Sequence, residues 1–330
     1  MSMPLLETRG LTKLFPVRRG GLGERGLLRA VDGVNLRLDE GETLGLAGES
    51  GCGKSTVAKL LMNLISPTEG TVSFQGNRID RLSKNDLFAF RRQVQMIFQD
   101  PQASLNPRMR IGDIIGEPLR IHRLAAPGEY HERVADLLRR VGLHDSYANR
   151  YPHEFSGGQR QRIGIARALA VQPKVIIADE PVSALDISIQ AQIINLLQEL
   201  RREYGLSMVF IAHDLSVVRH LSSSIAIMYL GRIVEWGGRD AVFDHFLHPY
   251  TEALISAIPK LSPETGSARI ILKGDIPTPL APPSGCPFHP RCFHAQERCS
   301  REIPLPEEKE PGHWAACHFS EKLFRGNGFC

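Results

Sequence analysis

A glycine-rich turn between an apolar run and a helical pattern constrains the fold of this chain more than any other feature. Residues 43–47 (TLGLA) are typical of a short buried strand, and residues 54–65 have the spacing of a helix. The turn between them matches the pattern G-x-x-x-x-G-K-[ST] in full. Its members are Gly48, Glu49, Ser50, Gly51, Cys52, Gly53, Lys54 and Ser55. A strand, a glycine loop and a helix in this order predict an α/β fold with a phosphate-binding loop.

The residue types of this loop fit the binding of a triphosphate. Glycines permit the turn that directs backbone N–H groups at phosphate oxygens, and the helix N-terminus adds partial positive charge. Lys54 is expected to reach the β- and γ-phosphates, and the Ser55 hydroxyl to ligate Mg²⁺. Cys52 could be a redox-sensing thiol at this helix start, or a small side chain that the loop tolerates.

The rest of the chain alternates predicted strands and helices. Apolar runs at residues 175–178, 208–212 and 225–230 are typical of strands buried in a parallel sheet. Residues 188–204 have helical spacing, and residues 86–169 are predicted to be mostly helical. Residues 5–15 and 31–38 have the partial alternation of half-buried strands, with a basic, glycine-rich loop at 18–26 between them. This order predicts a mostly parallel α/β domain.

Length and composition bound the domain organisation and the class of protein. The 330 residues suggest about two domains, and a boundary is expected near Pro259, because six prolines between residues 277 and 290 exclude regular helix there. The net charge of +4 does not indicate nucleic acid. No apolar stretch is long enough to cross a bilayer, and the first residues lack the features of a secretion signal. We therefore expect a chain that neither spans a membrane nor leaves the cytosol.

Two acidic residues follow the apolar run at residues 175–178. Asp179 is placed to hold Mg²⁺ through its coordination shell, and Glu180 to polarise a water for attack on the γ-phosphate. The alternative is a pair of solvated carboxylates at a strand end, and the complete phosphate loop upstream favours the catalytic interpretation.

A second glycine nest precedes the predicted helix at residues 160–170. It consists of Ser156, Gly157, Gly158 and Gln159. A serine and two glycines at a helix start can bind an anion, but one nucleotide does not need two such nests. We therefore expect this nest to serve a nucleotide held by another subunit, the alternative being an ordinary helix cap.

Four motifs stand in the order found in ATP-binding-cassette ATPases: GESGCGKST, FSGGQRQRIGIARAL, IIADEPVSALD and IAHD. Residues 5–258 resemble this family, with Phe155 where leucine is commoner. The resemblance implies a P-loop ABC ATPase domain over residues 1–258, with an antiparallel β subdomain and a helical subdomain at about residues 100–169. It also implies a head-to-tail dimer, in which each ATP lies between the phosphate loop of one subunit and residues 156–159 of the other.

The resemblance assigns roles to five further positions. Thr56 completes the phosphate-loop motif, and Gln99 is similar to the glutamine that senses Mg²⁺ and the γ-phosphate and links to the membrane partner. Asp186 resembles the aspartate of the dimer interface. His213 resembles the histidine that contacts the γ-phosphate and supports the attacking water. Phe15 is similar to the aromatic residue that stacks on adenine, although an aromatic side chain at a strand end is more often part of a core.

Two segments, one in the predicted helical subdomain and one in the C-terminal part of the chain, indicate which kind of ABC protein the chain resembles. The segment FQDPQASLNPRMRIGDIIGEPL resembles the surface that receives a coupling helix from a permease, and HPYTEALISAIP and GCPFHPRC resemble the C-terminal region of peptide-importer cassettes. This resemblance implies an ATPase that powers import of dipeptides or oligopeptides, with nickel, glutathione or another small solute as alternative cargo. A soluble nucleotide-binding regulator that senses iron or redox state is the alternative from another class.

The same resemblance implies partners and a location. We expect two transmembrane permease subunits, a second cassette chain in a heterodimer, and an indirect link to a solute-binding protein. The chain would then lie peripherally on the cytoplasmic face of the inner membrane.

Five of the six cysteines lie in the last 45 residues, in the predicted irregular tail domain at 259–330. Cys286, Cys292, Cys299 and Cys317 are separated by 5, 6 and 17 residues, which are longer gaps than structural zinc sites usually have. The peptide-importer resemblance points to a [4Fe–4S] cluster, and zinc or uncoordinated thiols are the alternatives. Cys330 is not expected to be a ligand. Four nearby histidines could replace a cysteine, namely His289, His294, His313 and His318.

Overall fold

The computed structural model describes residues 3–19, 24–126, 128–259 and 269–324. The chain forms two compact units. The first contains residues 38–43 and 81–211, and the second contains residues 3–37, 44–80 and those after 211. None of the helices in the described ranges combines the length and the apolarity needed to cross a bilayer.

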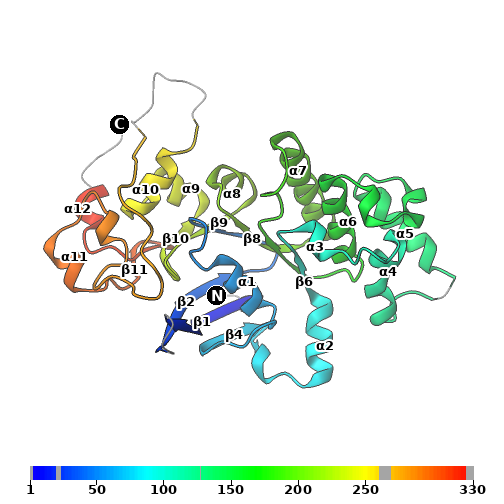
Figure 1. Ribbon diagram of the computed structural model, residues 1–330, viewed down its shortest axis with the longest axis horizontal. Helices are drawn as coiled ribbons and strands as arrows, with labels where there is room; N and C mark the ends of the chain where they lie inside the picture. Colours follow the sequence, from blue (N-terminus) through cyan, green and yellow to red (C-terminus); the bar gives the residue numbers. More distant parts are fainter. Residues whose placement is uncertain (1–2, 20–23, 127, 260–268, 325–330) are drawn as a thin grey trace. The chain divides into compact units, whose positions relative to one another are not determined.

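Parallel strands form the centre of the first unit (Figure 1). Strand β7 (Val175–Asp179) lies between β6 (Val94–Ile97) and β8 (Ser207–Ala212), and Ile177 pairs with Met96 on one side and Val209 on the other. Every residue of β7 and β8 is buried, which confirms the strands predicted from the apolar runs. Strand β6 lies in the segment predicted to be mostly helical, which contains this strand among its helices.

Helices make up most of the rest of the first unit. They are α2 (Lys84–Gln93), α3 (Pro101–Ser104), α4 (Ile111–Ile121), α5 (Tyr130–Arg140), α6 (Gly157–Leu169) and α7 (Ile187–Tyr204), with short 3-10 turns η2 (Asp145–Asn149) and η3 (Pro152–Glu154). Helices α4 and α5 approach closely at Gly116, where a Cβ atom would lie 2.0 Å from the Tyr130 hydroxyl. Helices α3 to α6 occupy the segment where a helical subdomain is predicted.

The second unit contains an antiparallel sheet and part of a mixed sheet. The antiparallel sheet has the order β2-β1-β4-β5, formed by β2 (Glu24–Leu38), β1 (Leu6–Arg19), β4 (Glu69–Phe74) and β5 (Asn77–Arg78). In the mixed part, β3 (Thr43–Ala47) runs parallel to β9 (Ser224–Tyr229), and β10 (Arg232–Gly238) is antiparallel to β9. The helical elements outside the tail are α1 (Lys54–Leu61), η1 (Ile79–Arg81), α8 (Leu215–Leu221), α9 (Arg239–Asp244) and α10 (Pro249–Ser256).

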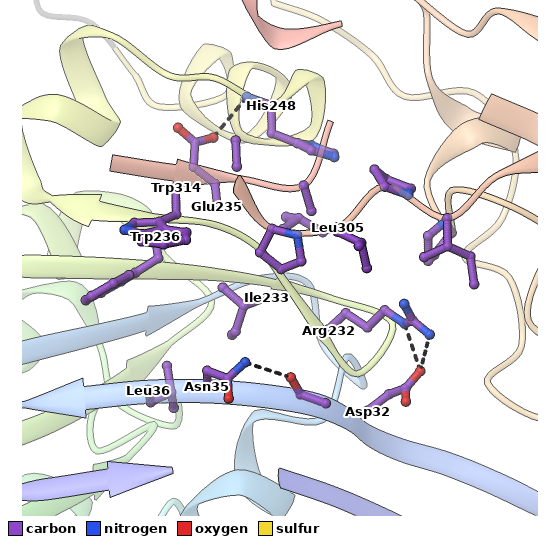
Figure 2. A pocket seen from close by; sticks show the side chains of 18 of the residues that line it. Asp32, Asn35, Leu36, Arg232, Ile233, Glu235, Trp236, His248, Leu305 and Trp314 are labelled. Atoms are coloured by element: carbon purple, nitrogen blue, oxygen red, sulfur yellow. Dashed lines mark hydrogen bonds and ion pairs between the residues drawn. The ribbon is translucent and has the colours of Figure 1, made fainter. Parts of the chain in front are cut away.

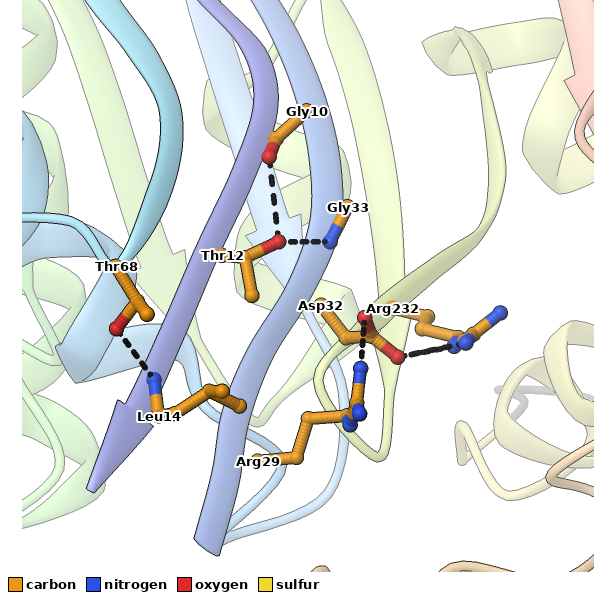
Figure 3. A network of polar contacts seen from close by, with 8 residues as sticks. All are labelled: Gly10, Thr12, Leu14, Arg29, Asp32, Gly33, Thr68 and Arg232. Atoms are coloured by element: carbon orange, nitrogen blue, oxygen red, sulfur yellow. Dashed lines mark hydrogen bonds and ion pairs between the residues drawn. The ribbon is translucent and has the colours of Figure 1, made fainter. Parts of the chain in front are cut away.

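A network of side chains fixes the bend of β1 (Figure 3). The pairing of β1 with β4 shifts register between Arg9 and Thr12, and Gly10 has a left-handed backbone with φ of 58°. The Thr12 hydroxyl donates to the Gly10 carbonyl and accepts from the Gly33 N–H of β2, at 3.2 and 3.0 Å. The threonine side chain thus replaces strand hydrogen bonds that the bulge interrupts.

The tail is more regular than the sequence predicts, because it adds two strands to the mixed sheet. Strand β12 (His313–Ala315) pairs with β10, and β11 (Glu307–Glu310) pairs with β12. The tail also contains η5 (His289–Arg291), α11 (Glu297–Arg301) and α12 (Ser320–Phe324). As predicted, the proline-rich residues 277–290 contain no α-helix, although the last two of them belong to the 3-10 turn η5.

A cavity of about 680 Å³ lies within the second unit (Figure 2). Its lining comes from β1, β2, β10, β12 and the loop of residues 303–306. Trp236 and Trp314, the two tryptophans of the chain, both line it. Their fluorescence therefore reports on the packing of the tail against β10.

Candidate functional site

The phosphate loop has the backbone that its glycines predict. Gly48, Gly51 and Gly53 have φ of 152°, 80° and 112°. A Cβ atom on Gly48 would lie 2.2 Å from the Met228 carbonyl oxygen, and one on Gly53 would lie 2.2 Å from that of Ala30. The loop follows β3 and leads into α1, so the strand–loop–helix prediction is confirmed, although α1 ends at residue 61 rather than 65.

The Lys54 ammonium and the Cys52 thiol are buried beside the backbone of the loop. The Lys54 ammonium donates hydrogen bonds to the carbonyls of Gly48 and Glu49, at 2.8 and 3.0 Å, so a positive charge is held at the loop. Burial raises the pKa of the Cys52 thiol. A protonated thiol is a poor redox sensor, which favours the interpretation of Cys52 as a small side chain that fits the loop. Ser55 and Thr56 lie in the first turn of α1 and are half-buried.

The structure brings two predicted catalytic residues of the first unit together. Gln99 follows β6 and Glu180 follows β7, and because these neighbouring strands are parallel, their carboxyl ends meet at one edge. The Gln99 amide donates to the Glu180 carboxylate at 3.0 Å. Asp179, the last residue of β7, is 4% exposed. An oriented carboxylate beside a buried one can act as a general base next to a cation ligand.

Glu180 is fixed by its backbone as well as by Gln99. It has a left-handed conformation with φ of 46°, and its N–H donates to the Ile211 carbonyl of β8 at 3.0 Å. A non-glycine residue in this region of φ stores strain that the surrounding strands must hold. Such strain is common at active sites.

The second glycine nest caps α6 and lies at the surface. The Ser156 hydroxyl accepts from the Gln159 N–H, and the Gln159 side chain accepts from the Ser156 N–H, at 3.3 and 3.0 Å. These two hydrogen bonds form a capping box, so within its own chain the nest acts as an ordinary helix cap. Ser156 and Gly157 are nevertheless exposed, so the nest remains accessible to a ligand from another molecule.

Helix α7 starts on the same unit with an exposed pair of residues. Asp186 is the N-cap of α7, but its side chain makes no capping hydrogen bond. Ile187 is 85% exposed, the most exposed large apolar side chain of the described residues. Sequence analysis missed Ile187, because an apolar first residue of a helix resembles a core position. Both side chains are therefore accessible to another molecule.

The two remaining predicted residues belong to the second unit. His213 is exposed and directly precedes Asp214, whose side chain caps α8. Phe15 of β1 is half-buried, and the Lys13 ammonium lies 5.2 Å from its ring centre. Phe15 is therefore not part of the buried core. The phosphate loop lies in this unit too, whereas Asp179 and Ser156 belong to the first.

Comparison with known proteins identifies the family. Residues 31–183 match the family model described as "ABC transporter". The chain is 53% identical over 319 residues to the oligopeptide transport ATP-binding protein AppF of Bacillus subtilis, covering 95% of this chain and 97% of that relative. The chain belongs to the ABC transporter family. It is 55% identical over 283 residues to the oligopeptide transport ATP-binding protein OppF of Escherichia coli, with 85% of each chain covered.

Comparison with solved structures leads to the same family for the ATP-binding part of the chain, here called the cassette. The dimeric post-hydrolysis structure of the ATP-binding cassette MJ0796, bound to ADP and Pi, superposes with a TM-score of 0.63 at 31% identity. That match covers 71% of this chain and 98% of the other. The cassette is thus an ABC-type ATPase, and the predicted fold class and enzyme class are confirmed. Residues 234–299 match a second family model, "Oligopeptide/dipeptide transporter, C-terminal region".

The four cysteines of the C-terminal tail, Cys286, Cys292, Cys299 and Cys317, lie in one region of the fold. Burial raises the pKa of Cys286 to about 12 and that of Cys292 to about 11, and the neighbouring cluster thiols add to both shifts. The Cys286 N–H donates to the Cys299 carbonyl at 2.8 Å. None of the described cysteines forms a disulfide. No three His, Cys, Asp or Glu side chains in the described ranges converge closely enough to hold a metal ion, so the predicted iron–sulfur cluster has no preformed site there.

Three of the histidines predicted as alternative ligands, His289, His313 and His318, have other hydrogen-bond partners. The His313 ring lies 2.8 Å from the Glu235 carboxylate, and both side chains are almost fully buried. Glu235 also accepts from the Leu247 and His248 N–H groups, at 2.7 and 3.1 Å. Glu235 therefore anchors the start of α10 and the tail strand β12 to β10. This role leaves no signal in the sequence, because an acidic residue in a strand has no local pattern that marks it as buried.

Proposed function

We propose that the cassette hydrolyses ATP to power the import of peptides through a membrane permease. The observation that carries the proposal is the match of residues 234–299 to the C-terminal region of oligopeptide and dipeptide transporters, in a chain whose residues 31–183 match the ABC transporter family. The relatives AppF and OppF, named for oligopeptide transport, align over most of this chain. They favour peptide over nickel, glutathione or another small solute as cargo.

The reaction is the transfer of the γ-phosphoryl group to water. Lys54 neutralises charge on the β- and γ-phosphates, while residues 48–56 direct N–H groups at the phosphate oxygens. Glu180, held by Gln99 at 3.0 Å, orients the attacking water. His213 contacts the γ-phosphate. Mg²⁺ supplies further charge neutralisation when it is bound, and the oxygen donors of Ser55, Gln99 and Asp179 suit such a hard cation.

Dimerisation supplies the second half of each nucleotide site. Ser156, Gly157, Gly158 and Gln159 of one subunit bind the γ-phosphate of an ATP held by the other. The exposure of Ser156, together with the exposed pair Asp186 and Ile187, supports a contact surface on this unit. We infer that the second subunit is a different cassette chain. Phe15 stacks on the adenine ring.

Permease contact involves the first unit. Phe98, next to Gln99, is 40% exposed, and the exposed Phe88 ring packs at a tilt against His122 with centroids 4.3 Å apart. Exposed aromatic side chains of this kind suit a coupling helix of a transmembrane partner. Two permease subunits would place the cassette peripherally on the cytoplasmic face of the membrane, with a solute-binding protein on the other side.

Cys286, Cys292, Cys299 and Cys317 are proposed to hold a [4Fe–4S] cluster. Four thiols in one region fit the soft donors that iron–sulfur clusters need. When bound, the cluster would stabilise the tail. Anaerobically purified protein should be brown and contain iron. Zinc in place of iron, or neither metal, would reject the cluster.

Purification and transport assays test the main proposal. The full transporter should purify with two membrane proteins and a second cassette chain. In proteoliposomes it should take up peptide from a loaded solute-binding protein when ATP is supplied, and a Glu180→Gln variant should bind ATP without uptake. Uptake of nickel or glutathione instead would change the cargo. Purification of the chain without any membrane protein, with nucleotide binding that depends on iron or redox state, would favour the soluble regulator.

A further inference from the structure

An arginine of the C-terminal tail forms an ion pair with the phosphate loop. The two terminal nitrogens of Arg291 donate to the two carboxylate oxygens of Glu49, at 2.6 and 3.0 Å. The residues are 242 positions apart in the sequence, and both belong to the second unit. The Arg291 side chain is 7% exposed and that of Glu49 is 26% exposed. A paired, two-point bond with this little exposure is stronger and more directional than a surface ion pair.

Aromatic side chains hold Arg291 in place. Arg291 ends η5, and Phe288, three residues earlier, is buried against both Tyr229 and Tyr250, with ring centroids 5.2 and 5.3 Å away. The Arg291 guanidinium lies 6.0 Å from the Tyr229 ring centre. Because the arginine leans on a packed aromatic cluster, its position does not depend on Glu49 alone.

The backbone of Glu49 is held from the same region. Its N–H donates to the Tyr250 hydroxyl at 2.9 Å, while its carbonyl accepts from the Lys54 ammonium at 3.0 Å. Arg291 fixes the side chain. The second residue of the phosphate loop is therefore clamped at three points, two of which come from the C-terminal part of the chain.

The ion pair also compensates the negative charge that Glu49 places on the phosphate loop. Glu49 places a carboxylate on a loop that would otherwise attract a triphosphate with N–H groups and the Lys54 ammonium. An uncompensated carboxylate in a partly buried position opposes the approach of another anion. Arg291 neutralises that charge by pairing with both carboxylate oxygens.

We propose that Arg291 is a positioning residue of the nucleotide site, which acts through Glu49 to keep the phosphate loop in its binding conformation. Through this contact the cysteine-containing tail sets the affinity of the cassette for ATP. The inference rests on the proposed binding of ATP by the phosphate loop.

Binding of a fluorescent ATP analogue with Mg²⁺ to the purified full-length chain tests the proposal. Arg291→Met should raise the dissociation constant about tenfold, because it leaves the Glu49 carboxylate unpaired. Arg291→Lys, which keeps the charge but not the two-point geometry, should recover part of the affinity. Adding Glu49→Gln to Arg291→Met should restore affinity relative to Arg291→Met alone, a rescue that a purely structural role of Arg291 would not produce.

A matched control separates this effect from general damage to the tail. Arg298, 55% exposed, pairs with Glu302 at 2.6 Å in the same region. Arg298→Met should leave ATP affinity unchanged, and tryptophan fluorescence should show that the tail of every variant remains packed. Wild-type affinity in Arg291→Met, or no rescue by Glu49→Gln, would overturn the role of Arg291. Failure of the wild-type chain to bind the analogue would overturn the nucleotide site itself.

Discussion

The buried histidine at the start of α10 predicts how the stability of the tail region depends on pH. His248 is 1% exposed, and its ring packs on Phe288 with centroids 5.6 Å apart. Burial lowers its pKa from 6.5 to about 3. The native state therefore keeps His248 neutral over a range in which the unfolded chain takes up a proton.

The sign and size follow from linkage between protonation and folding. A lowered histidine pKa contributes stability that is fully present above pH 6.5 and is lost as the pH falls toward 3. At pH 5 the loss is about 2 kcal/mol, since each unit below 6.5 costs about 1.4 kcal/mol per proton. Burial raises the pKa of Glu235, which has the opposite sign, because a protonated carboxyl becomes easier to bury as the pH falls.

A single substitution isolates the histidine contribution. His248 caps α10 by accepting from the Tyr250 N–H at 3.0 Å, and an asparagine can make the same cap without titrating. We expect His248→Asn to be less stable than wild type at pH 7.5, and to lose about 2 kcal/mol less between pH 7.5 and pH 5. Denaturant unfolding followed by the fluorescence of Trp236 and Trp314 measures both values. Equal losses in the two proteins would refute the buried neutral histidine.

Three further predictions concern turnover, packing and the loop. Glu180→Gln should lower ATP hydrolysis at least about a hundredfold while retaining ATP binding, as measured by phosphate release and by a fluorescent nucleotide. Phe288→Ala should destabilise the tail region by about 3–5 kcal/mol in the tryptophan-monitored unfolding, because it opens a cavity beside Tyr229 and Tyr250. Gly53→Ala should abolish ATP binding, since its Cβ atom would meet a carbonyl oxygen at 2.2 Å, whereas Gly238→Ala, with open space around it, should bind normally.

Sequence patterns predicted the buried strands well where burial is two-sided. The apolar runs that became β7, β8 and β9 have almost no exposed residues, so composition alone marks them. Strand β6 was missed, because its four residues follow α2 directly and continue its mixed pattern. Strands β11 and β12 were missed for a different reason: their residues, EEKE and HWA, gain strand structure only by pairing next to β10.

For the candidate site too, some features could be predicted from the sequence and others could not. Motif spacing and resemblance were enough to single out Gln99 and Glu180, which the structure then places 3.0 Å apart. They were not enough to find the contacts of Glu49, because an ion pair between residues 242 positions apart leaves no trace in a local pattern. Long-range polar contacts of this kind depend on the packing of the whole unit.

The contacts of Glu49 bear on what the tail is for. Tyr250 lies before the predicted boundary at Pro259 and Arg291 lies after it, yet both hold the same residue of the phosphate loop. A tail that only stabilised itself would need contacts within the tail, but its strand β12 pairs with β10 and its arginine reaches Glu49. The C-terminal region is therefore continuous with the nucleotide-binding unit. Cys292, a proposed cluster ligand, therefore lies one residue from the contact that joins the tail to the phosphate loop.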